Sequence, residues 1–330
     1  MNIHTPTPLM QTSVSIAEAV RRARMKRKRG TLNTENTFYS LCQKFKESQK
    51  FLGYERATQN LWARELDFAC RDDILGSCTL DEIRPALIQG YLDGWSDKPG
   101  KQAAALAAFK AIERWAVVRD LLSRPITLGV ETGKPAGGHI PWTEEQVALA
   151  QMHARSDLSR VIILGAYTGQ RGSDLVRMGW GDVEQFNGRQ GIAVTQKKTG
   201  RQIWVPILEP LAKAMASWEK RPGPFVLDMW GMPWTRKRLT EAWSYEVKTN
   251  PDLRGLREAG LVLHGLRGHA CVRLYRAGCT TRQVADMVGM SEPMVARYTR
   301  LSIQKENALA AVIHLENFSG TKLRKVESSE

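Results

Sequence analysis

Cysteine is scarce in this sequence, and long apolar runs are missing from it. The 330 residues include five cysteines, an odd number that forms no Cys-x-x-Cys pair. This pattern argues against a disulfide framework or a zinc site and predicts reduced thiols that mostly pack. No run approaches the roughly 18 apolar residues of a membrane helix, and no signal peptide opens the chain. We therefore expect a soluble, cytoplasmic protein. The cysteines are Cys42, Cys70, Cys78, Cys271 and Cys279.

Acidic residues are also few relative to basic ones. Asp and Glu number 34 against 48 Lys and Arg, which gives a net charge of +14 and a pI of about 9.7. Such an excess favours a polyanionic partner, because cations that neutralise phosphates release counterions. A merely soluble basic protein is the alternative. Membrane association would need an amphipathic anchor, and we see none in the sequence.

Composition divides the chain into five segments. Residues 1–31 form a basic arm whose cluster Arg21–Arg29 predicts a short helix or disorder, and it is either a DNA tether or a solvated tail. Residues 32–125 predict a domain of four helices, and the Pro- and Gly-rich residues 126–141 predict a linker. Residues 142–315 form a second domain, and residues 316–330 a tail.

Helical periodicity and capping signals place the elements of the first domain. Apolar stripes at helical spacing predict its core. Thr79 and Glu82 have the spacing of a capping box, so we expect the third helix to begin there. The stripes comprise Phe38, Leu41, Phe45 and Leu52 in the first helix, Leu61, Leu66 and Phe68 in the second, and Leu106, Phe109, Ile112, Trp115 and Ala116 in the fourth.

The second domain mixes helices with a short β segment. Thr143 and Gln146 predict a capped first helix, which a buried helix follows. Between residues 180 and 206 the periodicity changes toward two and predicts a β-hairpin that turns at Thr199 and Gly200. Two helices follow within residues 208–250. A helix starts near His264, another at Thr280 or Thr281, then a short one that carries Tyr298, and finally a separate amphipathic helix. We expect Trp218, Trp230, Trp234 and Trp243 to pack rather than stack on bases.

Three segments of the second domain carry residues suited to phosphoryl transfer. The stretch from His264 to Tyr298 supplies an imidazole, the guanidinium of Arg267 and a phenol that could act as a nucleophile. Upstream, TGQRGSDL contains Arg171, and TQKKTGR contains Lys198. Two alternatives stay open from the residues alone. Arg171 grips a phosphate or pairs with Asp174 or Asp182. The functional lysine is Lys198 or its neighbour Lys197. His269 and His314 are interpreted as structural.

In this order and spacing, the residues resemble the tyrosine recombinase (phage integrase) family. That family combines Arg in T-G-x-R-x-x-[ED]-L, Lys in a β-hairpin, H-x-x-R, a His or Trp, and Tyr. The match covers roughly residues 140–315. The His or Trp position holds Met290, whose thioether is no useful hydrogen-bond donor. If that donor is truly missing, Met290→His should raise the cleavage rate, whereas no gain would mean a site rebuilt around Met. The matching residues are Arg171, Lys198, His264, Arg267 and Tyr298.

The resemblance implies a mainly α fold with a small β-sheet or hairpin (α+β), in which a helical core-binding domain and a catalytic domain form a C-shaped clamp on DNA. It implies attack by Tyr298 to form a 3′-phosphotyrosine, with Arg171 and Arg267 on the phosphate. Lys198 protonates the leaving oxygen, and His264 acts as base and hydrogen-bond partner. No cofactor, ATP or metal is required.

The resemblance also implies partners. These are double-stranded recombination sites, a tetramer that exchanges strands through a Holliday junction, and accessory DNA-bending or directionality proteins. The C-terminal helix would dock into a neighbouring protomer or, alternatively, cover its own chain. The expected role is to integrate or excise a phage or other mobile element.

Two other functions remain alternatives. One is DNA relaxation of the type IB topoisomerase kind, and the other is a catalytically weakened DNA-binding protein of the same fold. The joint presence of the five matching residues argues against the second.

Overall fold

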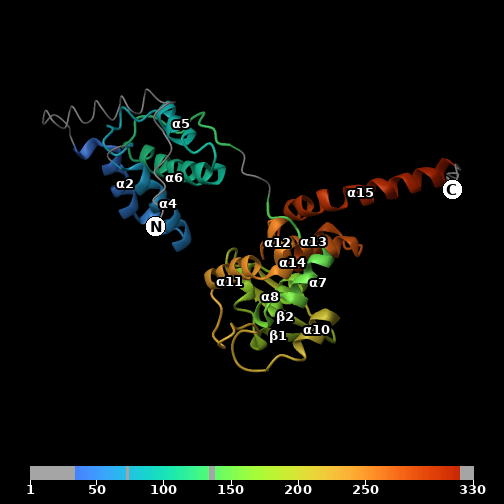
Figure 1. Ribbon diagram of the computed structural model, residues 1–330. Coiled ribbons are helices and arrows are strands. Elements are labelled where there is room, and N and C mark those ends of the chain that lie inside the picture. Colours follow the sequence, from blue (N-terminus) through green and yellow to red (C-terminus); the bar gives the residue numbers. More distant parts are fainter. Residues whose placement is uncertain (1–33, 72–73, 134–137, 320–330) are drawn as a thin grey trace. The chain divides into compact units, whose positions relative to one another are not determined.

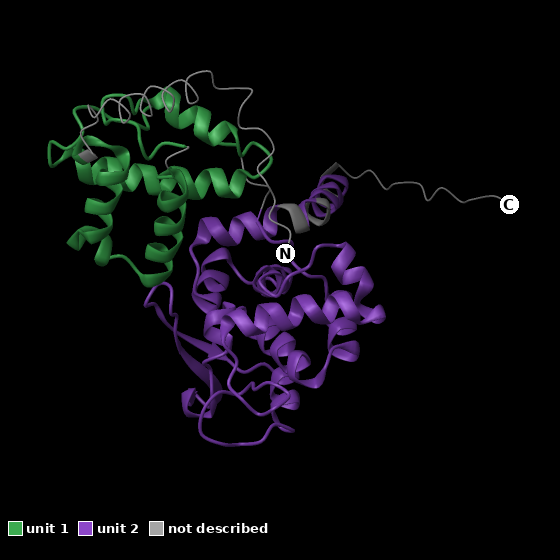
Figure 2. Ribbon diagram, turned by 60° about the vertical axis from the view of Figure 1, so that its left-hand side comes forward, with its two compact units in different colours: residues 1–137 green, residues 138–330 purple. Residues whose placement is uncertain are grey.

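The computed structural model describes residues 34–71, 74–133 and 138–319. Over these residues the chain is mostly helical and has one small antiparallel sheet (Figure 1), so the expected α+β class is confirmed. The chain divides into two compact units, residues 1–137 and 138–330 (Figure 2). The predicted basic arm 1–31 lies outside the described residues.

The first unit is a bundle of helices. Its first predicted helix is broken at Ser48, whose backbone is extended and whose Oγ accepts a hydrogen bond from the Phe51 amide at 3.2 Å. Ser48 thus ends one helix and caps the next. The elements are η1 (Thr34–Asn36), α2 (Phe38–Glu47), α3 (Gln49–Leu52), α4 (Arg56–Ala69), α5 (Pro85–Asp93) and α6 (Pro99–Val117).

The predicted start of the third helix was wrong. The Thr79 amide does donate to the Glu82 carboxylate, at 2.9 Å, but this contact closes a turn. Helix α5 begins only at Pro85. Proline disfavours helical geometry in the residue before it, here Arg84, and suits the first helical position, where no amide donor is needed.

Aromatic residues fill the core of the first unit. Phe38 and Tyr91 both pack against Phe109, with ring centroids 6.0 and 5.5 Å apart. The predicted stripe of α6 is buried throughout, whereas Leu52 is 52% exposed. Part of the Pro- and Gly-rich segment also packs here. Ile126 is fully buried, and its amide donates to the Glu113 carboxylate at 2.6 Å.

Helices supply most of the core of the second unit, and Ile192, Val194 and Val205 join it from the sheet. Thr143 and Gln146 form the predicted capping box at 3.2 and 2.9 Å. The unit comprises α7 (Glu144–His153), α8 (Ser156–Thr168), α9 (Gly172–Leu175), η2 (Trp180–Asp182), β1 (Val183–Phe186), β2 (Arg189–Thr195), β3 (Gln202–Pro206), α10 (Glu209–Met215), α11 (Arg236–Thr249), η3 (Pro251–Leu253), α12 (Arg254–Glu258), α13 (Gly265–Arg276), α14 (Thr281–Val288) and α15 (Glu292–Ser319).

The sheet has three strands in the order β1-β2-β3, all antiparallel. The predicted hairpin is β2 with β3, in which Val194 pairs with Ile203. Strand β1 was missed. Its connection to β2 is Asn187-Gly188, and both residues have positive φ. Asn-Gly is the strongest short-range hairpin signal, so the sequence did carry this strand.

The last two predicted helices are one. Helix α15 runs without a break for 28 residues, and its C-terminal part extends away from the other helices of this unit (Figure 1). The absence of Gly and Pro between residues 294 and 318 explains the continuity, because nothing there breaks a helix.

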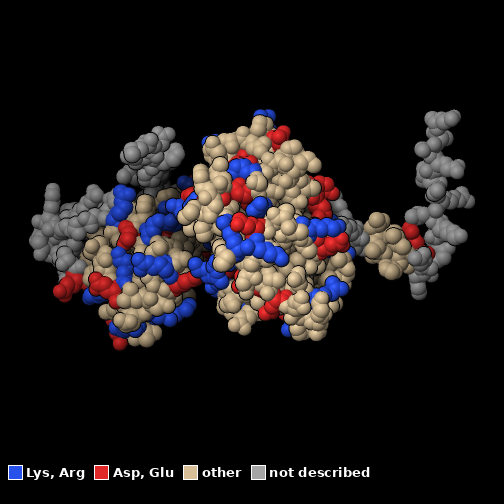
Figure 3. Space-filling view, turned by 90° about the horizontal axis from the view of Figure 1, so that it is seen from below, with Lys and Arg blue, Asp and Glu red and all other residues tan. Residues whose placement is uncertain are grey.

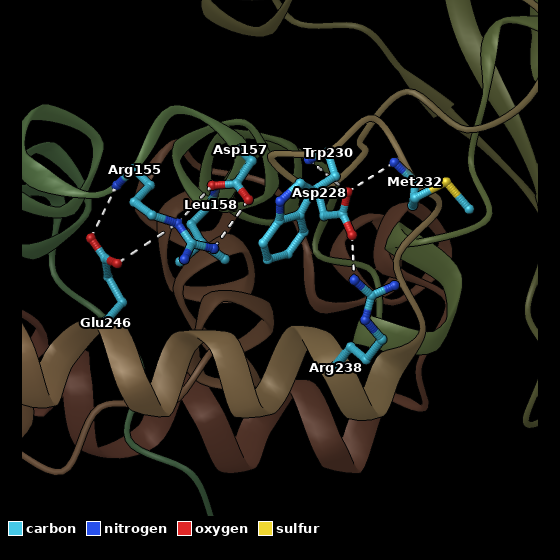
Figure 4. A network of polar contacts seen from close by, with 8 residues as sticks. All are labelled: Arg155, Asp157, Leu158, Asp228, Trp230, Met232, Arg238 and Glu246. Atoms are coloured by element: carbon cyan, nitrogen blue, oxygen red, sulfur yellow. Dashed lines mark hydrogen bonds and ion pairs between the residues drawn. The ribbon is translucent and has the colours of Figure 1, made fainter.

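Two polar networks hold α11 in place (Figure 4). Near its C-terminal end, Glu246 accepts from the Arg155 amide at 3.2 Å, and the Arg155 side chain donates to Asp157 at the start of α8. Near its N-terminal end, Arg238 donates to the carboxylate of Asp228. Together these contacts fix α11 at both ends.

Buried thiols and indoles largely follow the prediction. Trp218, Trp234 and Trp243 are buried, but Trp230 is 72% exposed, so its assignment as a packing residue was wrong. The buried cysteines are Cys42, Cys70, Cys78 and Cys271.

In the described part of the chain, no helix combines the length and apolar character needed to cross a membrane.

Candidate active site

Arg267 lies in the first turn of α13 and is 3% exposed. Its Nη1 donates to the carbonyls of Gly169 at 2.7 Å and Val288 at 2.9 Å, and its Nη2 donates to Gly289 at 3.0 Å. Burial, followed by the nearby charge of Arg171, lowers the Arg267 pKa to about 10. Three of five guanidinium donors are thereby fixed to backbone, which orients the planar group rigidly.

Arg171 stands directly before α9, in the N-cap position. Gly169 ends α8 with φ of +63°, and a Cβ there would approach Ala270 and Val288 to 2.9 Å. Glycine is therefore required for this tight turn. The two carboxylates proposed as alternative partners of Arg171 accept other donors. Asp174 accepts from the Lys197 amide at 2.9 Å, and Asp182 from the Gly179 amide at 2.8 Å.

A buried glutamine pair supports Arg171. Gln196 is fully buried, and its Oε1 accepts from Arg171 Nη1 at 2.9 Å. Its Nε2 donates to Gln170 at 2.8 Å and to the Val288 carbonyl at 3.1 Å. The same Val288 carbonyl accepts from Arg267, so one network joins both arginines. Sequence reasoning missed both glutamines, since a buried amide has no periodic signature.

Lys198 lies in the turn between β2 and β3, directly after this network. Gly200 has φ of +65°, and its amide donates to the Gln196 carbonyl at 2.9 Å. Thr199 donates to Gln196 Oε1 at 3.1 Å. Lys197 and Lys198 are both exposed. The turn is therefore anchored to the arginine network while its lysine side chains stand in solvent.

His264 occupies the N-cap position of α13 and is half-buried. Burial above all, and then the nearby His139, Arg267, Arg171 and Arg236, lower its pKa to about 4. The His139 ring meets it edge-on with centroids 4.7 Å apart. The imidazole is thus neutral at physiological pH and can accept a proton. His139 was missed because it lies in the predicted linker.

Tyr298 lies on α15 and packs against α13. A Cβ on Gly268 would come within 2.9 Å of Tyr298 Cδ1, so the glycine admits the ring. Burial raises the Tyr298 pKa, and Cys271 adds to this, whereas Arg267, Arg297 and Arg171 oppose it. The phenol is therefore protonated at neutral pH, and attack on phosphorus requires a base.

Met290 is 7% exposed and belongs to a small apolar cluster with Val284, Val288 and Val295. The Cys271 thiol approaches its sulfur at 3.6 Å. Its backbone carbonyl accepts from Arg201 at 3.1 Å. The position that would hold a His or Trp donor thus forms part of a packed apolar surface beside Tyr298.

Arg171 and Arg267 belong to one hydrogen-bond network through Gln196 and the Val288 carbonyl. His264 caps α13, the helix that carries Arg267, and Tyr298 packs against the same helix at Gly268. Lys198 stands on the adjoining turn rather than among them. Two guanidinium groups, a neutral imidazole and a phenol can bind a phosphate diester and attack it. In the described ranges, no three His, Cys, Asp or Glu side chains gather as metal ligands would.

Residues 144–305 match the model of the Phage integrase family. No curated protein sequence matches the chain. Solved structures match both units with low sequence identity, which supports the fold alone. A lambda integrase dimer bound to a COC′ core site shares 18% identity over 83% of this chain and 81% of that one, with a TM-score of 0.63.

Two further structures are similar. A lambda integrase tetramer bound to a Holliday junction shares 19% identity over 79% of this chain and 77% of that one, with a TM-score of 0.64. The Tn1549 transposon integrase in complex with circular intermediate DNA shares 19% identity over 79% of this chain and 94% of that one, with a TM-score of 0.59.

Proposed function

We propose that this chain, whose residues 144–305 match the Phage integrase family, is a tyrosine site-specific recombinase that cuts and rejoins DNA through a 3′-phosphotyrosine intermediate. The proposal rests on the hydrogen-bond network that Arg171 and Arg267 share, with His264 capping the helix of Arg267 and Tyr298 packed against that helix. A rigid guanidinium beside a second one matches the non-bridging oxygens of a phosphate diester.

The chemical step replaces the phosphate ester of the DNA strand with a phosphate ester of tyrosine. Tyr298 Oη attacks phosphorus in line, its proton passes to neutral His264, and the bond from phosphorus to the 5′-oxygen breaks. Lys198 gives a proton to that leaving oxygen. Arg171 and Arg267 stabilise the charge that builds on the phosphate oxygens. The reverse reaction with a 5′-hydroxyl of another strand rejoins the DNA.

The DNA substrate is supported by charge. The chain carries a net charge of +14, and Lys and Arg form patches on the visible face of each unit (Figure 3). We propose paired recombination sites of a phage or other mobile element as the substrate, with accessory DNA-bending or directionality proteins as partners.

Strand exchange needs several protomers, and we propose a tetramer on DNA. Helix α15 supports this, because Leu309, Val312 and Ile313 are 63%, 46% and 50% exposed at helical spacing. A second copy that receives this face would bury it. Leu309→Glu combined with Ile313→Glu should leave single-protomer DNA complexes intact and abolish larger ones in a mobility-shift assay. His314→Ala is the control on the same helix.

The proposal is tested by covalent capture. A nicked suicide duplex is built on the sequence that the protein enriches from genomic DNA, and a denaturing gel then reports the protein–DNA adduct. We expect an adduct with the wild type and none with Tyr298→Phe at equal DNA binding. Binding without an adduct in either protein would overturn the enzymatic proposal. Relaxation of a plasmid lacking the site would favour topoisomerase chemistry instead.

A further inference from the structure

The segment between α10 and α11 presents an apolar tip to solvent. Met229, Trp230 and Met232 are 59%, 72% and 57% exposed. They are adjacent in one tight loop, closed by an antiparallel bridge between Leu227 and Pro233. Large apolar side chains rarely cluster on a surface without a partner, because their exposure to water is unfavourable.

The loop is held rigidly from inside. The Asp228 carboxylate accepts from the amides of Trp230 at 3.0 Å and Met232 at 2.8 Å, and it also pairs with Arg238 (Figure 4). The Asp228 amide donates to the Met232 carbonyl at 2.9 Å. Trp234, 5% exposed, anchors the base of the loop in the core. Binding through this tip would therefore cost little ordering entropy.

Cations lie next to the tip. Arg236 and Lys237 open α11 and are exposed. Lys237 has an exposed partner, Glu241, at 3.8 Å, and such a pair contributes little. Arg236 Cγ would lie 3.9 Å from a Cβ on Gly172, the residue after Arg171. The loop thus leads directly into the helix end that borders the candidate active site.

We propose that the tip of residues 229–232 is a DNA-contacting wedge. Trp230 and its two methionine neighbours insert against the bases of the duplex beside the cleaved phosphate, while Arg236 and Lys237 contact flanking phosphates. Apolar side chains partly unstack base steps in this way, and an indole stacks on any base. This inference rests on the proposed function and adds to it a base-contacting surface outside the catalytic residues.

Charge favours DNA over a second copy of the chain as the occupant. In a two-fold interface the same patch meets itself, which would bring the cations Arg236 and Lys237 toward their own equivalents. A duplex instead offers phosphates to the cations and base faces to the apolar tip.

The test uses Tyr298→Phe as the background, so that binding is measured without cleavage. The probe is the enriched duplex with 2-aminopurine placed in turn at each step around the nick. With the tip intact, we expect fluorescence at one step to rise on binding, as unstacking requires. Trp230→Ala should abolish this rise and weaken binding about tenfold without changing the salt dependence. Tyr245→Ala, an aromatic 63% exposed on the adjoining helix α11, is the matched control.

Lys237→Ala tests the proposed phosphate contact separately from the base contact. It should lower the slope of log affinity against log salt by about 1 and keep the fluorescence signal. The inference is overturned if Trp230→Ala behaves like Tyr245→Ala, or if it changes only the oligomeric state of the DNA-free protein, which would identify a protein partner. If the parent protein does not bind the enriched duplex at all, the proposed function itself fails.

Discussion

Arg171 Nη1 donates a hydrogen bond of 2.9 Å to Oε1 of Gln196, and this amide is bound from its other side. Gln196 Nε2 donates to Gln170 and to the Val288 carbonyl, which also accepts from Arg267. Gln196 therefore acts as a positioning residue that couples the two arginines and the turn carrying Lys198.

Removing this amide should impair chemistry more than binding. We expect Gln196→Ala to lower the single-turnover rate of adduct formation by about 10²-fold, because small displacements of a catalytic group have effects of that size. Affinity for the same duplex should change much less, since the charge of Arg171 remains. Gln190→Ala, an exposed glutamine on β2, is the control. An unchanged rate would mean that the backbone alone positions Arg171.

Lys198 should act as a general acid, and the leaving group can reveal it. Lys198→Ala should lower cleavage by about 10²-fold or more on a normal duplex. A duplex with sulfur in place of the 5′-oxygen should restore the rate, because a thiolate leaves without protonation. Lys197→Ala is the matched control, since only its backbone amide contacts Asp174. If Lys197→Ala were the slow variant and the sulfur-containing duplex restored its rate, Lys197 would be the general acid.

His264 should titrate far below its ordinary range. With its pKa lowered to about 4 from 6.5, the unfolded chain binds more protons than the folded one between these values. The free energy of unfolding should therefore fall as pH drops through this window. His264→Gln should weaken this pH dependence of the free energy of unfolding in denaturant melts. A smaller dependence should remain because burial also lowers the pKa of His269. A His264 resonance titrating near 6.5 would contradict this.

DNA binding should raise the pKa of His264. A phosphate beside His264 favours the charged imidazole, so binding of the nicked duplex to Tyr298→Phe should raise the His264 pKa in a histidine NMR titration. No shift on binding would place the phosphate away from His264.

Met290→His should fail to accelerate cleavage. The side chain is 7% exposed among apolar residues, and an imidazole without partners there should lower the free energy of unfolding by about 1–3 kcal/mol. Motif comparison alone suggests the opposite result, a higher cleavage rate for Met290→His. Thermal melts and adduct rates would be compared with Met290→Leu, which conserves volume. A faster Met290→His enzyme would show that the pocket does accept a donor.

Much of the site was predictable because its signals are local. His-x-x-Arg, the Gly169 turn before Arg171 and the hairpin turn at Gly200 each need only a few adjacent residues to specify them. Asn187-Gly188 also indicates strand β1, which the predicted hairpin did not include. Helix boundaries were less predictable, as Ser48 and Pro85 show, because weak capping preferences compete there with backbone restrictions.

By itself the sequence determined the chemistry of the chain: the helical and strand periodicities, the cationic excess, and the residue types able to attack a phosphate. Only the tertiary structure decided that Gln196 joins the arginines, that Met290 packs rather than donates, that His139 meets His264, and that Asp228 locks an exposed Trp230. These relationships connect residues distant in sequence or depend on burial, and burial sets pKa values and hydrogen-bond partners only once the chain has folded.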